Sequence, residues 1–219
     1  IKSSAASDVY KRQFLTPEFW QPMVETVHGT IVECNTAYPG ERNTTDAHRR
    51  TMIKHGWSKL FDVDILDAEG PDLELPIPNG KRIQKNLVGK DIKNYDSMLV
   101  LSHFKGHPMG GFGGALKQLS IGCASSAGKA NIHGAGKPEE MWTTEQNAFL
   151  ESMADAAESV VKLFDGKIVY INVMKNMSVD CDCCAVAEDP CMKDIGILAS
   201  LDPCLLYTSP SPRDMRRSR

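Results

Sequence analysis

Apolar and polar positions along the chain repeat with two different periods, which predicts interleaved helices and strands. Near-continuous apolar runs predict buried strands at 97–102 and 167–174 and a shorter strand at 195–199. An apolar stripe at helical spacing predicts a long helix over 143–164. Because helices alternate with apolar strands, we expect an α/β fold with a mainly parallel or mixed sheet and helices packed on it.

The first half of the chain carries the same alternation in shorter segments. Thr16 and Pro17 are residue types favoured at a helix start, and they predict a helix that ends near residue 27. A second helix is expected over 44–55, where Gly56 supplies a stop signal. Three short strands are expected at 30–34, 61–66 and 73–77.

The two ends of the chain lack this periodicity. Residues 1–13 and 204–219 resemble translated sequencing adapters, so we expect both to be non-native tails on a fragment assembled from environmental DNA. Ordinary disordered termini are the alternative. The α/β domain would then span residues 14–203. The tails carry net charges of +2 and +3, so the net charge changes from −3 for the chain to −8 for this domain, which argues against nonspecific nucleic-acid binding.

Composition is that of an ordinary globular protein, with 42% hydrophobic and 24% charged residues. No apolar run reaches the ~18 residues of a membrane span, so we expect no membrane association. Four of the seven cysteines fall within eleven residues, whereas secreted disulfide-rich domains spread their cysteines. We therefore expect a cytoplasmic protein whose thiols stay reduced.

Cys181, Cys183 and Cys184 follow the strand predicted at 167–174. Soft thiolates select zinc, copper(I) or iron–sulfur clusters, so binding of a metal or a cluster is the first interpretation. Thiol redox chemistry and simple packing of buried cysteines are the alternatives. Aspartates flank the three cysteines, and they disfavour packing because a buried carboxylate is costly.

A segment rich in histidine, glycine and lysine follows the strand predicted at 97–102. His103, Lys105 and His107 are spaced by two, so in an extended chain they share one face. Glycines then precede a predicted helix, where backbone N–H groups can approach an anion. These glycines are Gly110, Gly111, Gly113 and Gly114. Lys117 lies about one turn inside that helix and could reach the same anion, whereas a solvated flexible loop is the alternative.

A second glycine–lysine stretch, residues 122–130, resembles a phosphate-binding P-loop only superficially. Five residues separate its glycines where the motif needs four, and Ala130 replaces the Ser or Thr that binds magnesium. We therefore reject nucleotide hydrolysis on this motif and keep Lys129 as a candidate anion contact. His133 either joins the site or faces water.

The blocks HFKGHPMGGFGGALKQLSIGCASSAGK, CDCC and DIGILASLDP, in this order, resemble the uncharacterised iron–sulfur centre proteins grouped as domain of unknown function 362. The resemblance covers most of residues 24–203. It implies an α/β fold and, as cofactor, an iron–sulfur cluster or another metal such as zinc. Many relatives carry a ferredoxin insert that is missing here between residues 134 and 144. The resemblance therefore implies that any cluster comes from a partner or has its ligands within the domain itself: Cys123, Cys181, Cys183 and Cys184.

Three functions stay open at this point. The first is a metal-binding or iron–sulfur redox protein that serves a redox partner protein. The second is an enzyme for a small anionic substrate or phosphorylated cofactor, in which Lys105 and Lys117 hold the anion and His103 or His107 moves a proton. The His/Gly/Lys segment is also similar, over a short stretch, to the one that holds a nickel-pincer cofactor in lactate-racemase-type enzymes. The third is a scaffold that passes metal or electrons to a partner.

Overall fold

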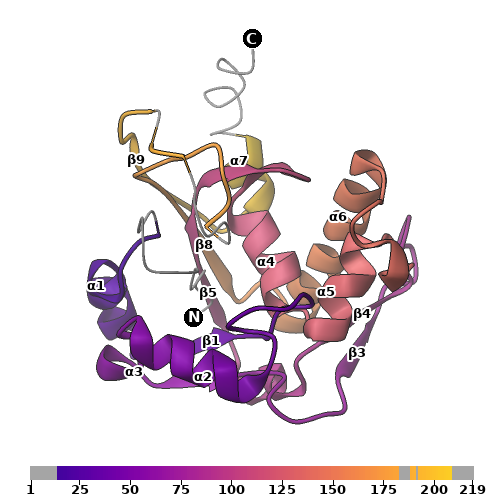
Figure 1. Ribbon diagram of the computed structural model, residues 1–219, viewed down its shortest axis with the longest axis horizontal. Coiled ribbons are helices and arrows are strands. Elements are labelled where there is room, and N and C mark those ends of the chain that lie inside the picture. Colours follow the sequence, from indigo (N-terminus) through magenta and orange to yellow (C-terminus); the bar gives the residue numbers. More distant parts are fainter. Residues whose placement is uncertain (1–13, 183–187, 191, 209–219) are drawn as a thin grey trace.

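A three-stranded sheet with helices on both faces forms the centre of the protein (Figure 1). The computed structural model describes residues 14–182, 188–190 and 192–208. In the sheet, β5 (Met98–His103) runs parallel to β8 (Ile168–Met174), and β9 (Gly196–Ser200) runs antiparallel to β8. A separate parallel pair joins β1 (Ile31–Glu33) to β2 (Val63–Ile65). The α/β fold predicted from the sequence is confirmed, with mixed sheets.

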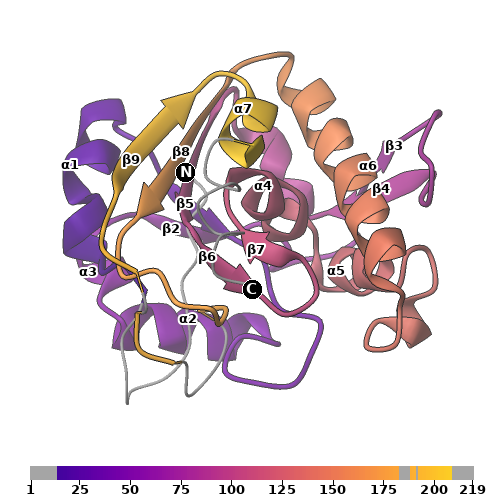
Figure 2. The same cartoon turned by 90° about the horizontal axis from the view of Figure 1, so that it is seen from above.

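Alternate side chains of β5 point to opposite faces of the sheet, and each face buries them against a different group of helices. Val100 packs into a core formed with α4 (Ala115–Cys123) and α6 (Gln146–Phe164). Leu101, the next residue, packs into a second core on the other face. That face is covered by α1 (Pro17–Val27), α2 (Thr45–Lys54) and α3 (Trp57–Leu60). Figure 2 shows the two helix groups on either side of the sheet. A strand buried on both faces explains the near-continuous apolar run in its sequence.

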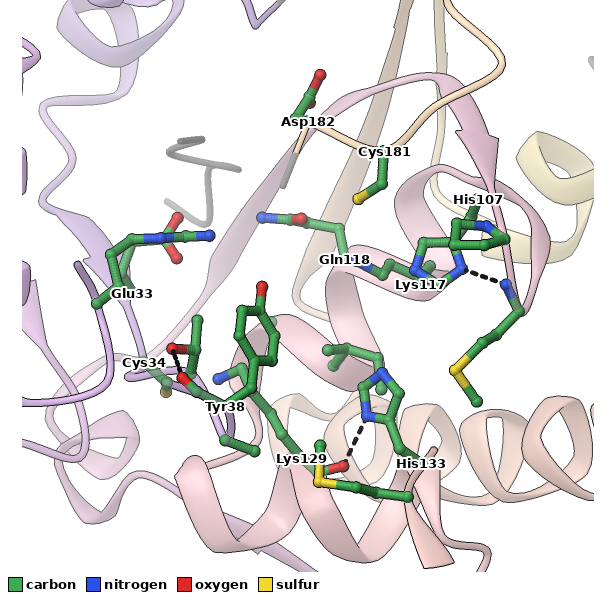
Figure 3. A pocket seen from close by; sticks show the side chains of 18 of the residues that line it. Glu33, Cys34, Tyr38, His107, Lys117, Gln118, Lys129, His133, Cys181 and Asp182 are labelled. Atoms are coloured by element: carbon green, nitrogen blue, oxygen red, sulfur yellow. Dashed lines mark hydrogen bonds between the residues drawn. The ribbon is translucent and has the colours of Figure 1, made fainter. Parts of the chain in front are cut away.

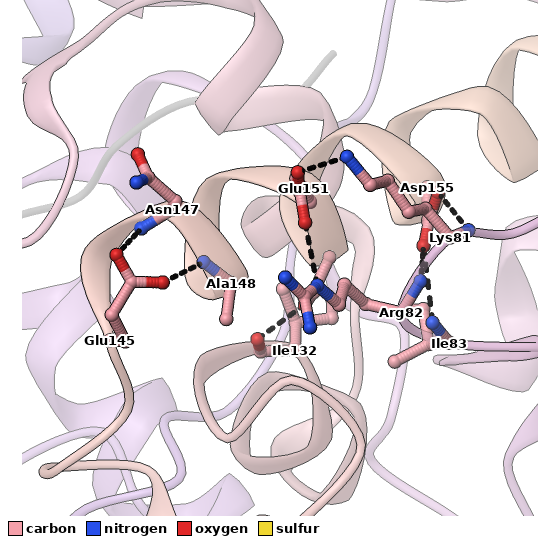
Figure 4. Close-up of polar contacts among 10 residues, drawn as sticks. Lys81, Arg82, Ile83, Ile132, Glu145, Asn147, Ala148, Glu151 and Asp155 are labelled. Atoms are coloured by element: carbon pink, nitrogen blue, oxygen red, sulfur yellow. Dashed lines mark hydrogen bonds and ion pairs between the residues drawn. The ribbon is translucent and has the colours of Figure 1, made fainter.

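The long helix α6 is fixed at its middle by an antiparallel hairpin of β3 (Leu73–Pro76) and β4 (Lys85–Val88). The carboxylate of Asp155 accepts three backbone N–H groups from the hairpin loop, at 2.7 to 3.1 Å, and Glu151 one turn earlier pairs with lysine and arginine side chains of the same loop (Figure 4). Charge-assisted hydrogen bonds of this kind are stronger than neutral ones. The hairpin therefore sets the position of α6 and of Phe149 on its first turn.

Several elements meet at the carboxyl ends of β1, β5 and β8. The hairpin of β6 (Lys105–His107) and β7 (Gly111–Gly113) directly follows β5 and leads into α4. Two further elements, α5 (Ser126–His133) and the 3₁₀ helix η2 (Pro138–Glu140), lie between α4 and α6. Another 3₁₀ helix, η1 (Lys90–Asn94), precedes β5. In open α/β sheets, ligands bind at the carboxyl ends of the strands, so this edge is where a site is expected.

Some local predictions were wrong. The glycine-rich segment after β5 forms the β6–β7 hairpin and not an irregular loop. Residues 126–133 form α5, although no helix was predicted there because this stretch was compared only with the P-loop motif. Thr16 occupies the position before α1, but its side chain makes no capping hydrogen bond. The last helix, α7 (Pro203–Thr208), includes the first residues of segment 204–219, and Leu206 packs in the core beside α4. The non-native origin of this segment stays a prediction. Among the described residues, none of the helices has the length and apolar character needed to cross a bilayer.

Candidate functional site

A cavity of about 440 Å³ opens at the carboxyl ends of the strands. Its walls come from segments that are far apart in the sequence: the loop after β1, the β6–β7 hairpin, α4, α5, the turn before α6 and the loop after β8. Figure 3 shows side chains from these segments converging on one space. A volume of this size is typical of a pocket for a small organic ligand.

Cationic side chains outnumber carboxylates in the cavity lining. The cations are Arg42, Lys105, Lys117 and Lys129. The carboxylates are Glu33 and Asp182. The lining is therefore positive although the whole chain carries a formal charge of −3. Charge of one sign in a cleft with low-dielectric walls concentrates ligands of the opposite sign, so the cavity favours an anion.

His107, the last residue of β6, is held in the neutral form with one defined tautomer. Its Nδ1 accepts backbone N–H groups from Met109 at 3.3 Å and Gly110 at 3.0 Å, so the ring proton lies on Nε2. Burial, together with the nearby Lys117 and other cationic groups, lowers the pKa of His107 to about 2. The ring is therefore a neutral hydrogen-bond donor through Nε2.

His133, the last residue of α5, is held in the opposite tautomer. Its Nδ1 lies 2.7 Å from the carbonyl oxygen of Lys129, which can only accept, so Nδ1 carries the proton and Nε2 carries the lone pair. Burial is the largest cause that lowers the pKa of His133 to about 4, and Lys117 and Lys129 add to it. In Figure 3 this second ring nitrogen of His133 points toward Lys117 and His107. His133 is therefore a neutral base.

Phe149 of α6 aligns the two imidazole rings. Its ring is fully buried, and it stacks on His133 at 5.0 Å between ring centroids and on His107 at 6.3 Å. Ser152, one turn further along α6, donates a hydrogen bond to the carbonyl of Ile132 and ties α5 to α6 beside these rings. The hairpin that fixes α6 thus also fixes the two histidines.

The opposite end of the cavity holds an ion cluster. Asp182 lies 2.6 Å from Nζ of Lys105 and 3.0 Å from Nδ1 of His103, and all three side chains are buried. Burial alone would raise the pKa of Asp182, but Lys105 and His103 outweigh it and hold the pKa well below its usual range. Nε2 of His103 faces the carbonyl of Lys175 at 2.7 Å. Both ring nitrogens therefore face acceptors, which fixes the orientation of the ring.

This ion cluster fixes the loop after β8 against β6. Gly106 N donates to the carbonyl of Ser178 at 2.8 Å, and a Cβ at position 106 would lie 1.9 Å from the carbonyl oxygen of Val179. Only glycine permits this approach. Cys181, which precedes Asp182, is thereby held at the cavity wall and is 3% exposed.

A model of the family described as domain of unknown function (DUF362) matches residues 1–206. The chain belongs to this family. No curated protein and no solved structure matches it. The family membership predicted from the three sequence blocks is thus confirmed, and the site of this DUF362 chain is interpreted from its own residues.

The predicted site residues divide into those that border the cavity of this DUF362 chain and those that support it. Lys105, His107, Lys117 and Lys129 line it, whereas His103 lies behind Lys105 in the ion cluster. Nζ of Lys129 donates to the carbonyl of Ala124 at 2.6 Å. His133, for which the sequence left two alternatives open, borders the cavity.

The four glycines of the His/Gly/Lys segment shape the hairpin and do not border the cavity. The N–H of Gly110 is used by His107, and Gly111 has a φ of +73°, which favours glycine in the turn. Gly113 lies in β7, and Gly114 packs against the side chains of Asn172 and Phe104. Ala115 N, at the start of α4, donates to Asn172. Their role as anion contacts stays a prediction.

The candidate cysteine ligands lie in different environments. Cys123 is fully buried in the core beside Val100 and Leu119, with its Sγ 3.9 Å from the sulfur of Met98, and it does not border the cavity. Cys181 borders the cavity, while Cys183 and Cys184 lie outside the described residues. Within the part of the chain that the structure describes, no group of three or more His, Cys, Asp or Glu residues is arranged to hold a metal ion.

Several site residues could not be predicted from the sequence, because only the packing of distant segments brings them to the cavity. Asp182 was noted only as a neighbour of cysteines, although its carboxylate contacts His103, which lies 79 positions earlier in the chain. Phe149 looked like an ordinary core position on a helix. Tyr38 and Trp142 sat in segments with no motif. A pairing of the two separated histidines with one buried phenylalanine could not be read from local spacing.

Proposed function

We propose that this DUF362 domain is an enzyme that binds a small anionic ligand in the cavity and moves a proton on it through His107 and His133. Two neutral imidazoles with opposite tautomers on one cation-lined cavity are the observation that carries the proposal. His133 would take a proton from the ligand at Nε2. His107 would keep its proton and donate a hydrogen bond from Nε2 to the ligand atom on which negative charge forms. His133 would then return the proton it took to another atom of the ligand. The net reaction is a proton transfer or an isomerisation, and it needs no external oxidant.

Anion binding would also tune the two histidines. The pKa values of His107 and His133 are lowered by burial and by the neighbouring lysines, Lys117 among them. A bound negative charge offsets those lysines and so raises the pKa of His133 toward the working range of a general base, whereas Nδ1 of His107 stays occupied by two backbone N–H groups. Binding at pH 6 should therefore be accompanied by proton uptake, which is a signature that an inert anion site lacks.

Calorimetry with acetate, lactate and inorganic phosphate tests the binding step. Titrations at pH 6 in two buffers of different ionisation enthalpy report the number of protons taken up. We expect binding with net proton uptake, weakened roughly tenfold by Lys117→Met because one charge contact is lost. Lys85→Met is the matched control, since Lys85 pairs with Glu74 on the exposed hairpin, far from the cavity lining. An absence of binding for all three anions would overturn the proposal.

Solvent isotope exchange tests the chemical step. Carbon-bound protons beside the carboxylate of a bound acid should exchange for deuterium in D₂O, as followed by proton NMR. His133→Gln should abolish the exchange because it removes the base, and His107→Gln should slow it about 10²-fold or more. Exchange that persists at the parent rate in His133→Gln would contradict the assigned role.

The position of Cys181 supports a second candidate function. Its thiol borders the same cavity and precedes the carboxylate of the ion cluster, so Cys181 together with Cys183 and Cys184 would form the thiolate site of a metal-binding or iron–sulfur redox protein. The packing of Cys123 against Met98 fits a core residue better than a fourth ligand beside Cys181. Metal analysis and a visible spectrum of anaerobically purified protein test this function. Absence of iron and zinc after reconstitution would exclude it.

A further inference from the structure

Trp142 differs from the other two tryptophans of the chain. Trp20 and Trp57 are 2% and 0% exposed in the core beneath the sheet, whereas Trp142 is 67% exposed at the cavity rim. A large aromatic side chain left in water contributes little to folding. Its place at the mouth of the cavity indicates a binding role.

Tyr38 meets Trp142 across this rim. The two rings lie 5.9 Å apart between centroids at an angle of 55°, and they come from the loop after β1 and from the turn before α6. Both residues belong to the cavity lining, and Figure 3 shows the ring of Tyr38 standing among the other labelled side chains. Two aromatic faces therefore bound one side of the cavity mouth.

The backbone holds both rings in place. In the loop that carries Tyr38, Thr36 donates its N–H to the carbonyl of Arg42 and its hydroxyl to the carbonyl of Tyr38. In the turn that carries Trp142, the carbonyl of Glu140 accepts hydrogen bonds from Thr143 N and Thr144 N at 2.9 and 3.0 Å. A preorganised aromatic pair loses little entropy when a ligand packs on it.

The cavity is also larger than a small anion requires. Its volume of about 440 Å³ would hold on the order of fifteen water molecules. Apolar side chains continue the wall from the aromatic rim inward: Met109, Ile121 and Met141. A two- or three-carbon acid would leave this apolar wall wet, whereas a ligand with a flat apolar body would cover it.

We propose that the ligand of this site is an anion with a planar aromatic group, which packs on Trp142 and Tyr38 while its charged group lies among the lysines. The inference rests on the proposed function for the anionic end alone. The aromatic end is carried by separate residues, so the two can be tested separately.

A pair of probes that share one charged group makes this test. Phenyl phosphate carries the aromatic group and inorganic phosphate does not, and both are titrated by calorimetry against the full chain, Trp142→Ala and Lys117→Met. We expect phenyl phosphate to bind about tenfold more tightly than inorganic phosphate, because aromatic stacking adds to area burial. Trp142→Ala should remove that tenfold advantage and leave inorganic phosphate unchanged. Lys117→Met should weaken both probes alike.

Tryptophan fluorescence gives an independent readout. Since Trp20 and Trp57 are buried, quenching of the red-shifted emission reports on Trp142. Phenyl phosphate should quench this emission in the parent chain, and inorganic phosphate should not. Trp142→Phe should restore the affinity lost in Trp142→Ala, since it keeps an aromatic face.

The outcomes separate the two proposals. Equal affinity of both probes, with no change in Trp142→Ala, would overturn the aromatic inference and leave the anion site intact. Binding of neither probe would overturn the anion site and the inference together. Circular dichroism of each variant shows that it is folded, and the exposed position of Trp142 makes unfolding by its substitution unexpected.

Discussion

The two ends of the cavity contain the same kinds of groups in opposite charge states. At one end His107 is buried and His133 is partly buried, and both are neutral with lowered pKa values. At the other end Asp182 is buried and stays ionised, with His103 and Lys105 on either side. Burial acts against charge at both ends. The difference is that the imidazole pair faces cations and backbone groups, whereas the carboxylate faces the ammonium of Lys105 and hydrogen-bonds with His103.

This contrast supports different proposed roles for the two ends of the cavity. The imidazole end is uncharged and can accept or give a proton without an internal ion pair to break. The ion cluster compensates its own charges, and it pins the loop that carries Cys181 against β6. We therefore assign chemistry to the first end and positioning to the second. The following predictions test that division.

Asp182→Asn should have the largest effect on stability. It removes the carboxylate that Lys105 and His103 contact, and breaking a buried ion pair by removing one partner costs about 3–5 kcal/mol. Urea unfolding at pH 7 measures this loss. Glu74→Gln is the control, because its pair with Lys85 is more than half exposed and should contribute less than about 1 kcal/mol. A loss for Asp182→Asn as small as the control's would mean that the cluster has no structural role.

The imidazole end should make the protein sensitive to mild acid. The folded pKa values of His107 and His133 lie below the unfolded value of 6.5, so below that value the unfolded chain binds more protons. Stability is complete above about pH 6.5 and should fall as the pH drops toward 4. At pH 5 the loss is about 2 kcal/mol for each imidazole.

Urea midpoints measured from pH 7.5 to pH 5 in parent and variant chains check this pH dependence. His133→Gln should reduce the acid-induced loss of stability by about the amount that one imidazole contributes. The double variant with His107→Gln should reduce this loss further. The other histidines are common to all three chains, so the differences isolate the two rings. Identical curves in all chains would show that neither ring is held neutral.

Regular elements with a strong apolar pattern could be predicted from the sequence. The strands β5 and β8 and the helix α6 lie within about three residues of their predicted positions, because their buried faces dictate the pattern. The β6–β7 hairpin was missed because glycines and polar residues carry no such pattern. The helix α5 was missed although Ser125 caps it, since its side chain accepts from Gly128 N at 3.0 Å.

The candidate site could be predicted only where local spacing controls it. Lys105 and His107 are two positions apart in β6, so the period of two of a strand correctly predicted that they share one face. Asp182 and Trp142 reach the cavity through tertiary packing of distant segments. The tautomers of His107 and His133 depend on backbone atoms of a tight turn and of a helix end. Those hydrogen bonds have no signature in residue types.

Lys117→Met should produce the smallest effect, a shift in the pKa of His133. Lys117 contributes to the lowered pKa of His133, after burial, by electrostatic repulsion of the charged ring. Removing the ammonium should raise the pKa of His133 from about 4 by roughly half a unit to one unit. Ring ¹H–¹⁵N correlations recorded from pH 3 to pH 7 measure the shift, and Lys85→Met should leave it unchanged. No shift in Lys117→Met would mean that the charge of Lys117 does not help to keep His133 neutral. Anion binding would then leave the ring's basicity unchanged, and the coupling between anion and base would be lost from the proposed chemistry.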